Sequence, residues 1–198
     1  QGSILAIASI LVRAMGMIYR IPMTAIIGDK GHGFYSYAYS VYTILLLLSS
    51  YSLPLAVSKM VSAKAQLGQW RNVKRVFICA IAFAIGIGTT FGLIVLIGAQ
   101  FFTRVFFHSE LAAIALRFMA PTILIMALLG VFRGFFQGLQ NTLPTAVSQI
   151  VEGLINAIMS VVFAYFLFDF GHGMDAAGGT TDLGYAWGAA GGAIGTGA

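Results

Sequence analysis

Residues 3–27 read SILAIASILVRAMGMIYRIPMTAII, a long apolar stretch that is interrupted by Arg13 and Arg20. A helix of about 20 apolar residues spans the hydrocarbon core of a bilayer. A guanidinium group at the centre of such a helix costs about 2.5 to 3.5 kcal/mol even on insertion scales. We therefore predict a membrane-spanning helix whose arginines avoid lipid and face water or other helices.

The two arginines share one polar face of this predicted helix. They are seven residues apart, which is almost two helical turns, so their side chains point the same way. Ser9, Gly16 and Thr24 lie on the same face, while the other residues are mostly Ile, Leu, Met, Ala and Val. Such a face predicts the lining of a wet cavity or a contact with other helices.

The composition extends the membrane prediction to the whole chain. Hydrophobic residues make up 59% and charged residues 9% of the 198 residues, whereas about a quarter of a soluble domain is charged. Long unbroken apolar runs exclude the alternating strands of a membrane β-barrel. We predict an all-α polytopic membrane protein. The net charge of +5 includes no basic cluster interleaved with aromatic residues, so we expect no nucleic-acid partner.

The apolar runs predict a single lobe with five spans and the start of a sixth. The expected spans are 3–27, 34–62, 76–102, 111–139 and 145–168, with the sixth beginning at 186–198. Pro22 and Pro54 are expected to kink or break the first two spans. The expected connections are a Gly-rich turn at 28–33, a basic interfacial segment at 64–75 and a Gly-rich acidic loop at 169–185. Because the last segment is too short to span and no initiator methionine is present, we expect a fragment of a longer protein.

Positive charge marks the expected cytoplasmic side. Five basic residues surround the connection between the second and third spans: Lys59, Lys64, Arg71, Lys74 and Arg75. Most acidic residues fall on the other side of the membrane, including Asp29, Glu110 and Asp169. Basic loops stay in the cytoplasm, so this asymmetry predicts a cytoplasmic N-terminus.

Polar residues inside two other spans predict a substrate cavity. The fifth span carries Gln149, Glu152 and Asn156 on one face, at helical spacing. The fourth span carries Arg133 close to its end. Charges of both signs within membrane spans, together with the arginines of the first span, imply a hydrated interior.

These charges leave two interpretations open. In one, Arg13 pairs with Glu152 in a purely stabilising bridge, which leaves Arg20 and Arg133 without an acidic partner. In the other, the charges bind a substrate, and this is favoured because buried ion pairs stabilise less than apolar packing. The cationic excess then predicts an anionic head, and the guanidinium fork suits phosphate. The candidate substrate-binding residues are Arg13, Arg20, Arg133, Gln149, Glu152 and Asn156.

The third span has no polar face. Its small residues include Gly88 and Gly92, a spacing that suits close packing of helices in a membrane. Gly130, Gly134 and Gly138 repeat this spacing on the fourth span. We expect these glycines to serve helix packing rather than a binding site.

Five segments resemble the polysaccharide biosynthesis and export proteins. They are RAMGMIYRIP at 13–22, GDKGHG at 28–33 followed by Tyr35, LPLAVSK at 53–59, RGFFQG at 133–138 and PTAVSQIVE at 144–152. The chain is similar to the stage V sporulation protein B-like branch of the multidrug/oligosaccharidyl-lipid/polysaccharide flippase superfamily. This superfamily includes the MurJ-type lipid II flippases. The resemblance covers nearly all of the chain.

The resemblance implies one lobe of a V-shaped, two-lobed transporter of the bacterial cytoplasmic membrane. It implies alternating access around a central cationic cavity, with a polyprenyl pyrophosphate oligosaccharide or peptidoglycan precursor as cargo. Arg13 and Gly16 match the Arg-x-x-Gly pattern of the first helix in MurJ-type proteins, and Arg20 falls one position after the second arginine of that pattern. The expected partners are this lipid-linked sugar, membrane lipids and the missing C-terminal lobe. No cofactor is expected, and the energy source (Na⁺, H⁺ or membrane potential) stays open.

Three other functions are weighed against a flippase. A multidrug or cation antiporter of the same superfamily favours an acidic and aromatic lining, so a net positive cavity argues against it. An intramembrane enzyme is not expected, because the sequence contains no HExxH or GxSxG motif. A non-transporting scaffold for polysaccharide assembly needs no cavity, so the accessibility of Arg13 to water would separate it from a flippase.

Overall fold

The computed structural model describes residues 2–49, 52–178 and 182–197, in which all regular structure is α-helical. The helices are α1 Gly2–Ser49, α2 Leu53–Gln66, α3 Trp70–Phe107, α4 Ala112–Gly138, α5 Leu143–Gly178 and α6 Leu183–Gly197. Four helical stretches of this part of the chain are long and apolar enough to cross a membrane, and the first of them, Leu5–Gln66, contains the kink of α1. The predicted all-α polytopic membrane protein is confirmed.

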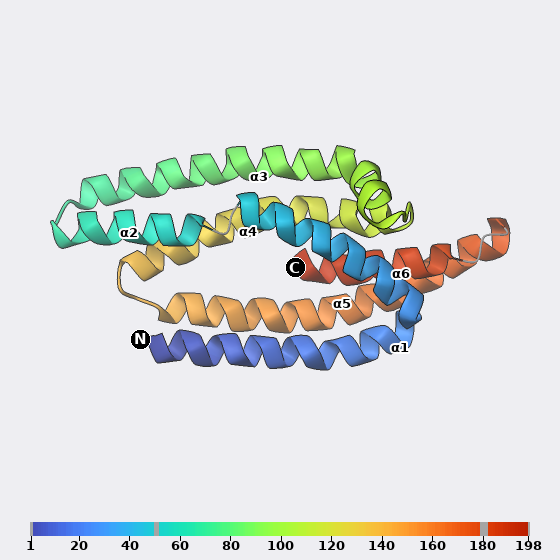
Figure 1. Cartoon of the computed structure of the whole chain (residues 1–198). Coiled ribbons are helices and arrows are strands. Elements are labelled where there is room, and N and C mark those ends of the chain that lie inside the picture. The colour runs from blue at the N-terminus through green and yellow to red at the C-terminus, as the bar shows by residue number, and fades with distance from the viewer. Residues whose placement is uncertain (1, 50–51, 179–181, 198) are drawn as a thin grey trace.

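The helices run back and forth between two ends of the molecule (Figure 1). One end holds the N-terminus, the α2–α3 connection and the α4–α5 connection, and the other holds the kink of α1, the α3–α4 connection and the end of α5. The first half of α1 packs along α5, whereas α2 and α3 pack on α4. The C-terminal end of α6 returns to the interior of the bundle.

The turn expected at 28–33 is a kink at one residue. Gly28 has φ 64° and ψ 179°, and it is the one non-helical position within α1 as described. Glycine adopts this left-handed φ without steric cost, so the chain reverses direction there and the helix resumes at once. The chain therefore turns where expected, but Gly28 alone makes the turn, and residues 29–33 are helical. Pro22, expected to kink the first span, lies within α1 without breaking its helical torsions.

Other connections are also shorter than expected. The expected break near Pro54 is not seen at the proline itself, because Pro54 occupies the first turn of α2, where proline loses no hydrogen bond. Only Leu67–Gln69 separates α2 from α3, and α5 continues to Gly178 through the stretch expected to be a loop. Charged and glycine residues at helix ends look like loops in the sequence, although they remain helical when neighbouring helices pack against them.

Small residues set the packing of α4 against its neighbours. A Cβ added to Gly134 would lie 2.5 Å from the carbonyl oxygen of Pro54 on α2, and one added to Gly88 would lie 2.9 Å from the Cα of Leu124. Helix backbones therefore touch at these positions, as the small-residue spacing predicts. Beside these contacts, a buried apolar cluster that includes Val57, Val61 and Val131 joins α2, α3 and α4. A larger buried cluster, which includes Met23, Tyr42 and Ile123, joins α1 and α4 to α3, α5 and α6.

Candidate functional site

A polar groove follows α1 and is made of three adjoining hollows. The first, of about 260 Å³, shares Arg13 with the second, of about 480 Å³. The second shares Arg20 with the third, of about 420 Å³, which lies by the kink of α1 and also contacts His32. We call this continuous surface the arginine groove. All six predicted site residues line it: Arg13, Arg20, Arg133, Gln149, Glu152 and Asn156.

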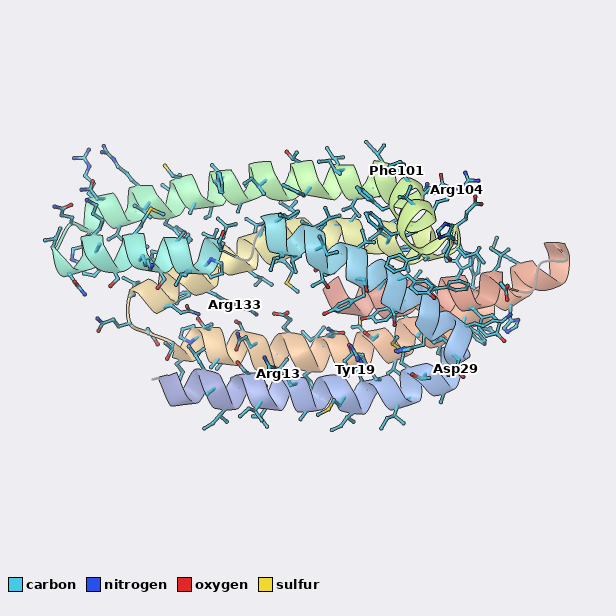
Figure 2. The ribbon with its side chains drawn as sticks, viewed as in Figure 1. Arg13, Tyr19, Asp29, Phe101, Arg104 and Arg133 are labelled. Carbon is cyan, nitrogen blue, oxygen red and sulfur yellow. The ribbon has the colours of Figure 1, made fainter. Side chains whose placement is uncertain are left out.

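The middle hollow is open because α1 presents a small residue there. Its walls are Arg13, Gly16 and Arg20 on the first half of α1, Asn156 on α5, and Tyr39 on the second half of α1. A Cβ added to Gly16 would meet no atom within 4 Å. The glycine thus leaves free volume between the two arginines. Figure 2 shows Arg13 on the side of α1 that faces α5.

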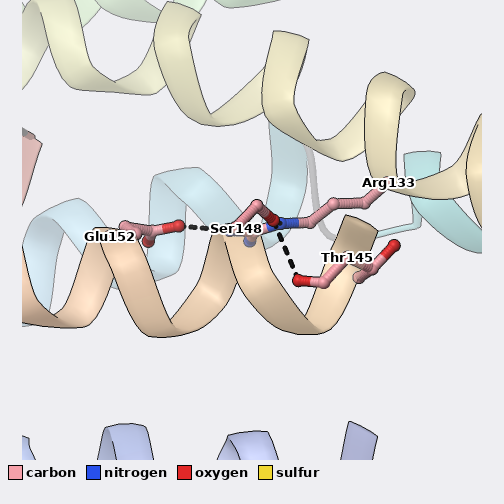
Figure 3. A network of polar contacts seen from close by, with 4 residues as sticks. All are labelled: Arg133, Thr145, Ser148 and Glu152. Atoms are coloured by element: carbon pink, nitrogen blue, oxygen red, sulfur yellow. Dashed lines mark hydrogen bonds and ion pairs between the residues drawn. The ribbon is translucent and has the colours of Figure 1, made fainter. Parts of the chain in front are cut away.

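A hydrogen-bonded network closes one end of the groove (Figure 3). Arg133 on α4 donates from Nη2 to Oε2 of Glu152 on α5, and its Nε donates to Oγ of Ser148 at 3.1 Å. The Ser148 hydroxyl in turn donates to the carbonyl oxygen of Thr145 at 2.9 Å. The side chains of Arg133 and Glu152 are 17% and 25% exposed. The network therefore fixes the direction of the Arg133 side chain. Both members of the ion pair remain partly exposed and line the groove.

The ion pair corrects the proposed partner of Glu152, which is Arg133 rather than Arg13. The α4–α5 connection is short, so the last turns of α4 lie against the first turns of α5 and bring these two residues together. Arg13 and Arg20 are exposed, and neither makes an ion pair with a described acidic residue. The groove therefore carries two unpaired guanidinium groups, about 10 Å apart along α1.

The polar face of α5 serves two purposes. In its middle, Oε1 of Gln149 is buried beside the first hollow and accepts no hydrogen bond from the described residues. Toward the other end, the buried hydroxyl of Ser160 donates to Oδ1 of Asn156 at 2.9 Å and contacts the carbonyl oxygen of Gly192 on α6 at 3.3 Å. Ser160 is thus a packing residue, and it holds Asn156 in place at the groove.

Sequence reasoning missed three lining or supporting residues. Ser148 lies one turn before Glu152, and this helical spacing is a signal that could have identified it. Tyr39 and His32 carried no such signal, because only the kink at Gly28 folds the second half of α1 back toward the groove. Within the described part of the chain, no cluster of three His, Cys, Asp or Glu side chains could hold a metal ion.

Two Bacillus subtilis (strain 168) proteins are similar to the chain. It is 27% identical over 163 residues to lipid II flippase MurJ, an alignment that covers 78% of the chain and 30% of that protein. It is 26% identical over 175 residues to stage V sporulation protein B, covering 88% of the chain and 34% of that protein. The chain thus spans about a third of the length of these relatives. No solved structure shows significant similarity to it.

The family model for polysaccharide biosynthesis proteins matches residues 1–184, which is most of the chain. The matched region includes the arginines of α1, the kink at Gly28 and the Arg133–Glu152 network. The resemblance noted in the sequence is therefore confirmed over α1 to α5. The chain belongs to the polysaccharide biosynthesis protein family.

Proposed function

We propose that the chain forms one lobe of a flippase that moves a lipid-linked sugar pyrophosphate across the bacterial cytoplasmic membrane. Membership of the polysaccharide biosynthesis family and similarity to a protein named lipid II flippase support this class of activity. The observation that carries the proposal is that Arg13 and Arg20, on one face of a membrane helix, make no ion pair with an acidic residue in the described part of the chain. Such charges are expensive inside a bilayer unless water or a ligand meets them.

The charge of the groove matches a pyrophosphate. Arg133 and Glu152 neutralise each other, so Arg13 and Arg20 leave an excess of two positive charges. A pyrophosphate diester carries two negative charges, and each guanidinium binds two oxygens in a fork. The arginines replace the hydration of the headgroup during its passage, while the polyprenyl tail stays in lipid.

The amides of α5 supply contacts for the sugar. Gln149 presents a buried acceptor that receives no hydrogen bond from the residues described, and Asn156 lies in the same hollow as Arg13 and Arg20. A buried acceptor that stays unsatisfied costs about 1 to 3 kcal/mol, so a sugar hydroxyl gains from donating to it. The cargo in this proposal therefore has its phosphates on α1 and its first sugar toward α5.

The arginines provide the direct test. In the full-length protein, Arg13→Ala removes a bidentate charged contact worth about 3 kcal/mol, so we expect translocation of a lipid-linked sugar in proteoliposomes to fall by about 100-fold. Arg13→Lys should restore only part of the rate, because an ammonium group lacks the fork. Arg104→Ala, which breaks an exposed ion pair with Glu110 outside the groove, is the matched control and should transport normally. Full translocation by Arg13→Ala would refute the proposed substrate role.

Orientation is a separate part of the proposal. The end of the bundle with the α2–α3 connection carries the basic residues, and we propose that it faces the cytoplasm, as does the N-terminus. With Cys79 replaced by serine, single cysteines at Lys30 and Glu110 should react with an impermeant maleimide added to intact cells. A cysteine at Gln69 should react only after the cells are opened. Labelling of Gln69 from outside would invert the proposed topology.

A further inference from the structure

An apolar hollow of about 500 Å³ lies between α2 and α3, and none of its lining residues belongs to the arginine groove. Its floor consists of buried residues, Leu53 and Val57 on α2 and Ala80 on α3. Exposed side chains form the sides, among them Cys79 and Phe83. We call this surface the α2–α3 groove.

The lining of the α2–α3 groove includes one cation, Arg75. Arg75 lies in the first two turns of α3, which begin with the exposed Trp70 and also carry Arg71 and Lys74. From Val76 onward α3 is apolar for many turns. Tryptophan and basic residues collect where a helix meets the headgroup layer. Arg75 therefore stands at the membrane interface, and the groove extends from it about 12 Å into the hydrocarbon, the length of eight helical residues.

No acidic side chain that the structure describes neutralises the basic charge around this groove. Five cations surround the α2–α3 connection, and no acidic residue occurs between Asp29 and Glu110. None of these five makes an ion pair with a described acidic side chain. They are Lys59, Lys64, Arg71, Lys74 and Arg75. This surface attracts anions, as a juxtamembrane basic cluster attracts acidic lipids.

We propose that the α2–α3 groove binds one anionic phospholipid, with its phosphate at Arg75 and an acyl chain along the apolar floor. Diffuse attraction of acidic lipids to a basic surface does not require an adjoining groove. Non-specific contact with bulk lipid does not require an arginine at the end of the groove. The combination of an interfacial guanidinium and an adjoining apolar channel fits the two parts of a phospholipid. This inference is independent of the proposed cargo, because the groove shares no residue with the flippase site.

Cys79 gives a direct reporter of occupancy, since it is exposed and lines the groove. The test uses the full-length protein in detergent, with any other cysteine removed, and follows alkylation of Cys79 by monobromobimane. Phosphatidylglycerol should slow the reaction about tenfold, and phosphatidylcholine should change it less than twofold. The matched control is Ile97→Cys in a Cys79→Ala background, because Ile97 lies on the same helix, is 80% exposed and is outside the groove. Its labelling should not distinguish the two lipids.

Charge variants separate a bound lipid from diffuse attraction. Arg75→Gln should raise the phosphatidylglycerol concentration for half-protection of Cys79 about fivefold, since it removes a direct hydrogen bond to the phosphate worth about 1 kcal/mol. Arg71→Gln, which removes the same charge outside the groove, should raise it less than twofold. Equal effects of the two variants would overturn the proposal in favour of a general basic surface. Equal protection by both lipids, or a Cys79 that is unreactive before lipid is added, would also overturn it.

Discussion

Two pairs of packed helices, α1–α5 and α3–α4, use glycine in opposite ways. On α3, a Cβ at Gly88 would come within 2.9 Å of the Cα of Leu124, so the missing side chain lets the backbones of α3 and α4 meet. On α1, a Cβ at Gly16 would meet nothing within 4 Å, so the missing side chain leaves space beside Arg13 and Arg20. Glycine therefore allows close backbone contact between α3 and α4, whereas it leaves an open space between α1 and α5.

The two helix pairs also differ in the polarity of the residues that line their hollows. The hollow beside the α3–α4 contact is lined by small and apolar residues and Thr89, without a charged side chain. The arginine groove has three guanidinium groups and one carboxylate. Unpaired charge persists in a membrane span only where water or a ligand reaches it. We therefore expect α3–α4 to act as a structural support and α1–α5 to carry the proposed substrate-binding face, which we call the working face.

Removing the carboxylate of the working face should have the largest effect. Glu152→Leu leaves Arg133 unpaired in a part-buried position, which we expect to cost about 2 kcal/mol of stability and to abolish transport. The double variant Arg133→Leu with Glu152→Leu should recover thermal stability, because it leaves no uncompensated charge, yet it should not transport. Thermal unfolding in detergent and translocation in proteoliposomes measure the two effects. If Glu152→Leu alone unfolds at the same temperature as the parent protein, the ion pair between Arg133 and Glu152 does not form in the folded protein.

A side chain at the support contact should affect stability alone. Gly88→Val places atoms against the backbone of α4 and should cost about 2 kcal/mol through overpacking. Gly86→Val is the matched control on the same helix, because a Cβ there meets no atom within 4 Å. Thermal unfolding of both variants isolates the contact from the helix propensity of valine. If the two variants unfold at the same temperature, α3 and α4 do not pack as closely as the structure has them.

The amides of α5 should affect transport without loss of stability. Gln149→Leu or Asn156→Leu removes a hydrogen bond to the sugar, so we expect transport to fall about tenfold, equivalent to about 1.4 kcal/mol. Thermal stability should stay the same or rise slightly, since leucine places an apolar side chain where Gln149 has an unsatisfied acceptor. Ser160→Ala at the α5–α6 contact provides the comparison and should lower stability more than transport. Normal transport by both leucine variants would identify this face of α5 as packing.

The smallest effect is expected at Gly16. Gly16→Ala should raise stability by about 0.5 to 1 kcal/mol, because alanine is the better helix former and the site is open. It should lower transport about threefold, since a methyl group narrows the hollow between the arginines. Gly153→Ala across the groove differs, because its Cβ would press on Val12 and Met15 at 3.2 to 3.3 Å. We expect Gly153→Ala to lower stability. If Gly16→Ala lowered stability by the same amount, α1 and α5 would pack together at Gly16 and the middle hollow would not be open.

Much of the candidate site was predictable because the cost of polar groups in lipid is a local property of each helix. Arg13 and Arg20 on one face of a span, and Gln149, Glu152 and Asn156 on one face of another, already indicated which sides avoid hydrocarbon. The structure places all of these side chains along one groove. Helix ends were less predictable, because tertiary contacts extend helices through glycine and charged residues that look like loops.

The membrane class, the helical architecture and the faces that turn away from lipid could be read from the amino-acid sequence. These follow from hydropathy and from a period of 3.6 residues, and neither depends on distant contacts. The pairing of Glu152 with Arg133 required the tertiary structure, since the partner depends on how α4 and α5 meet across their short connection. The tertiary structure also decided that Tyr39 reaches the groove, because the left-handed residue Gly28 within α1 sets the direction of the second half of this helix. The polar face of a helix depends on the sequence of that helix alone, whereas the partner of a side chain depends on how several helices pack together.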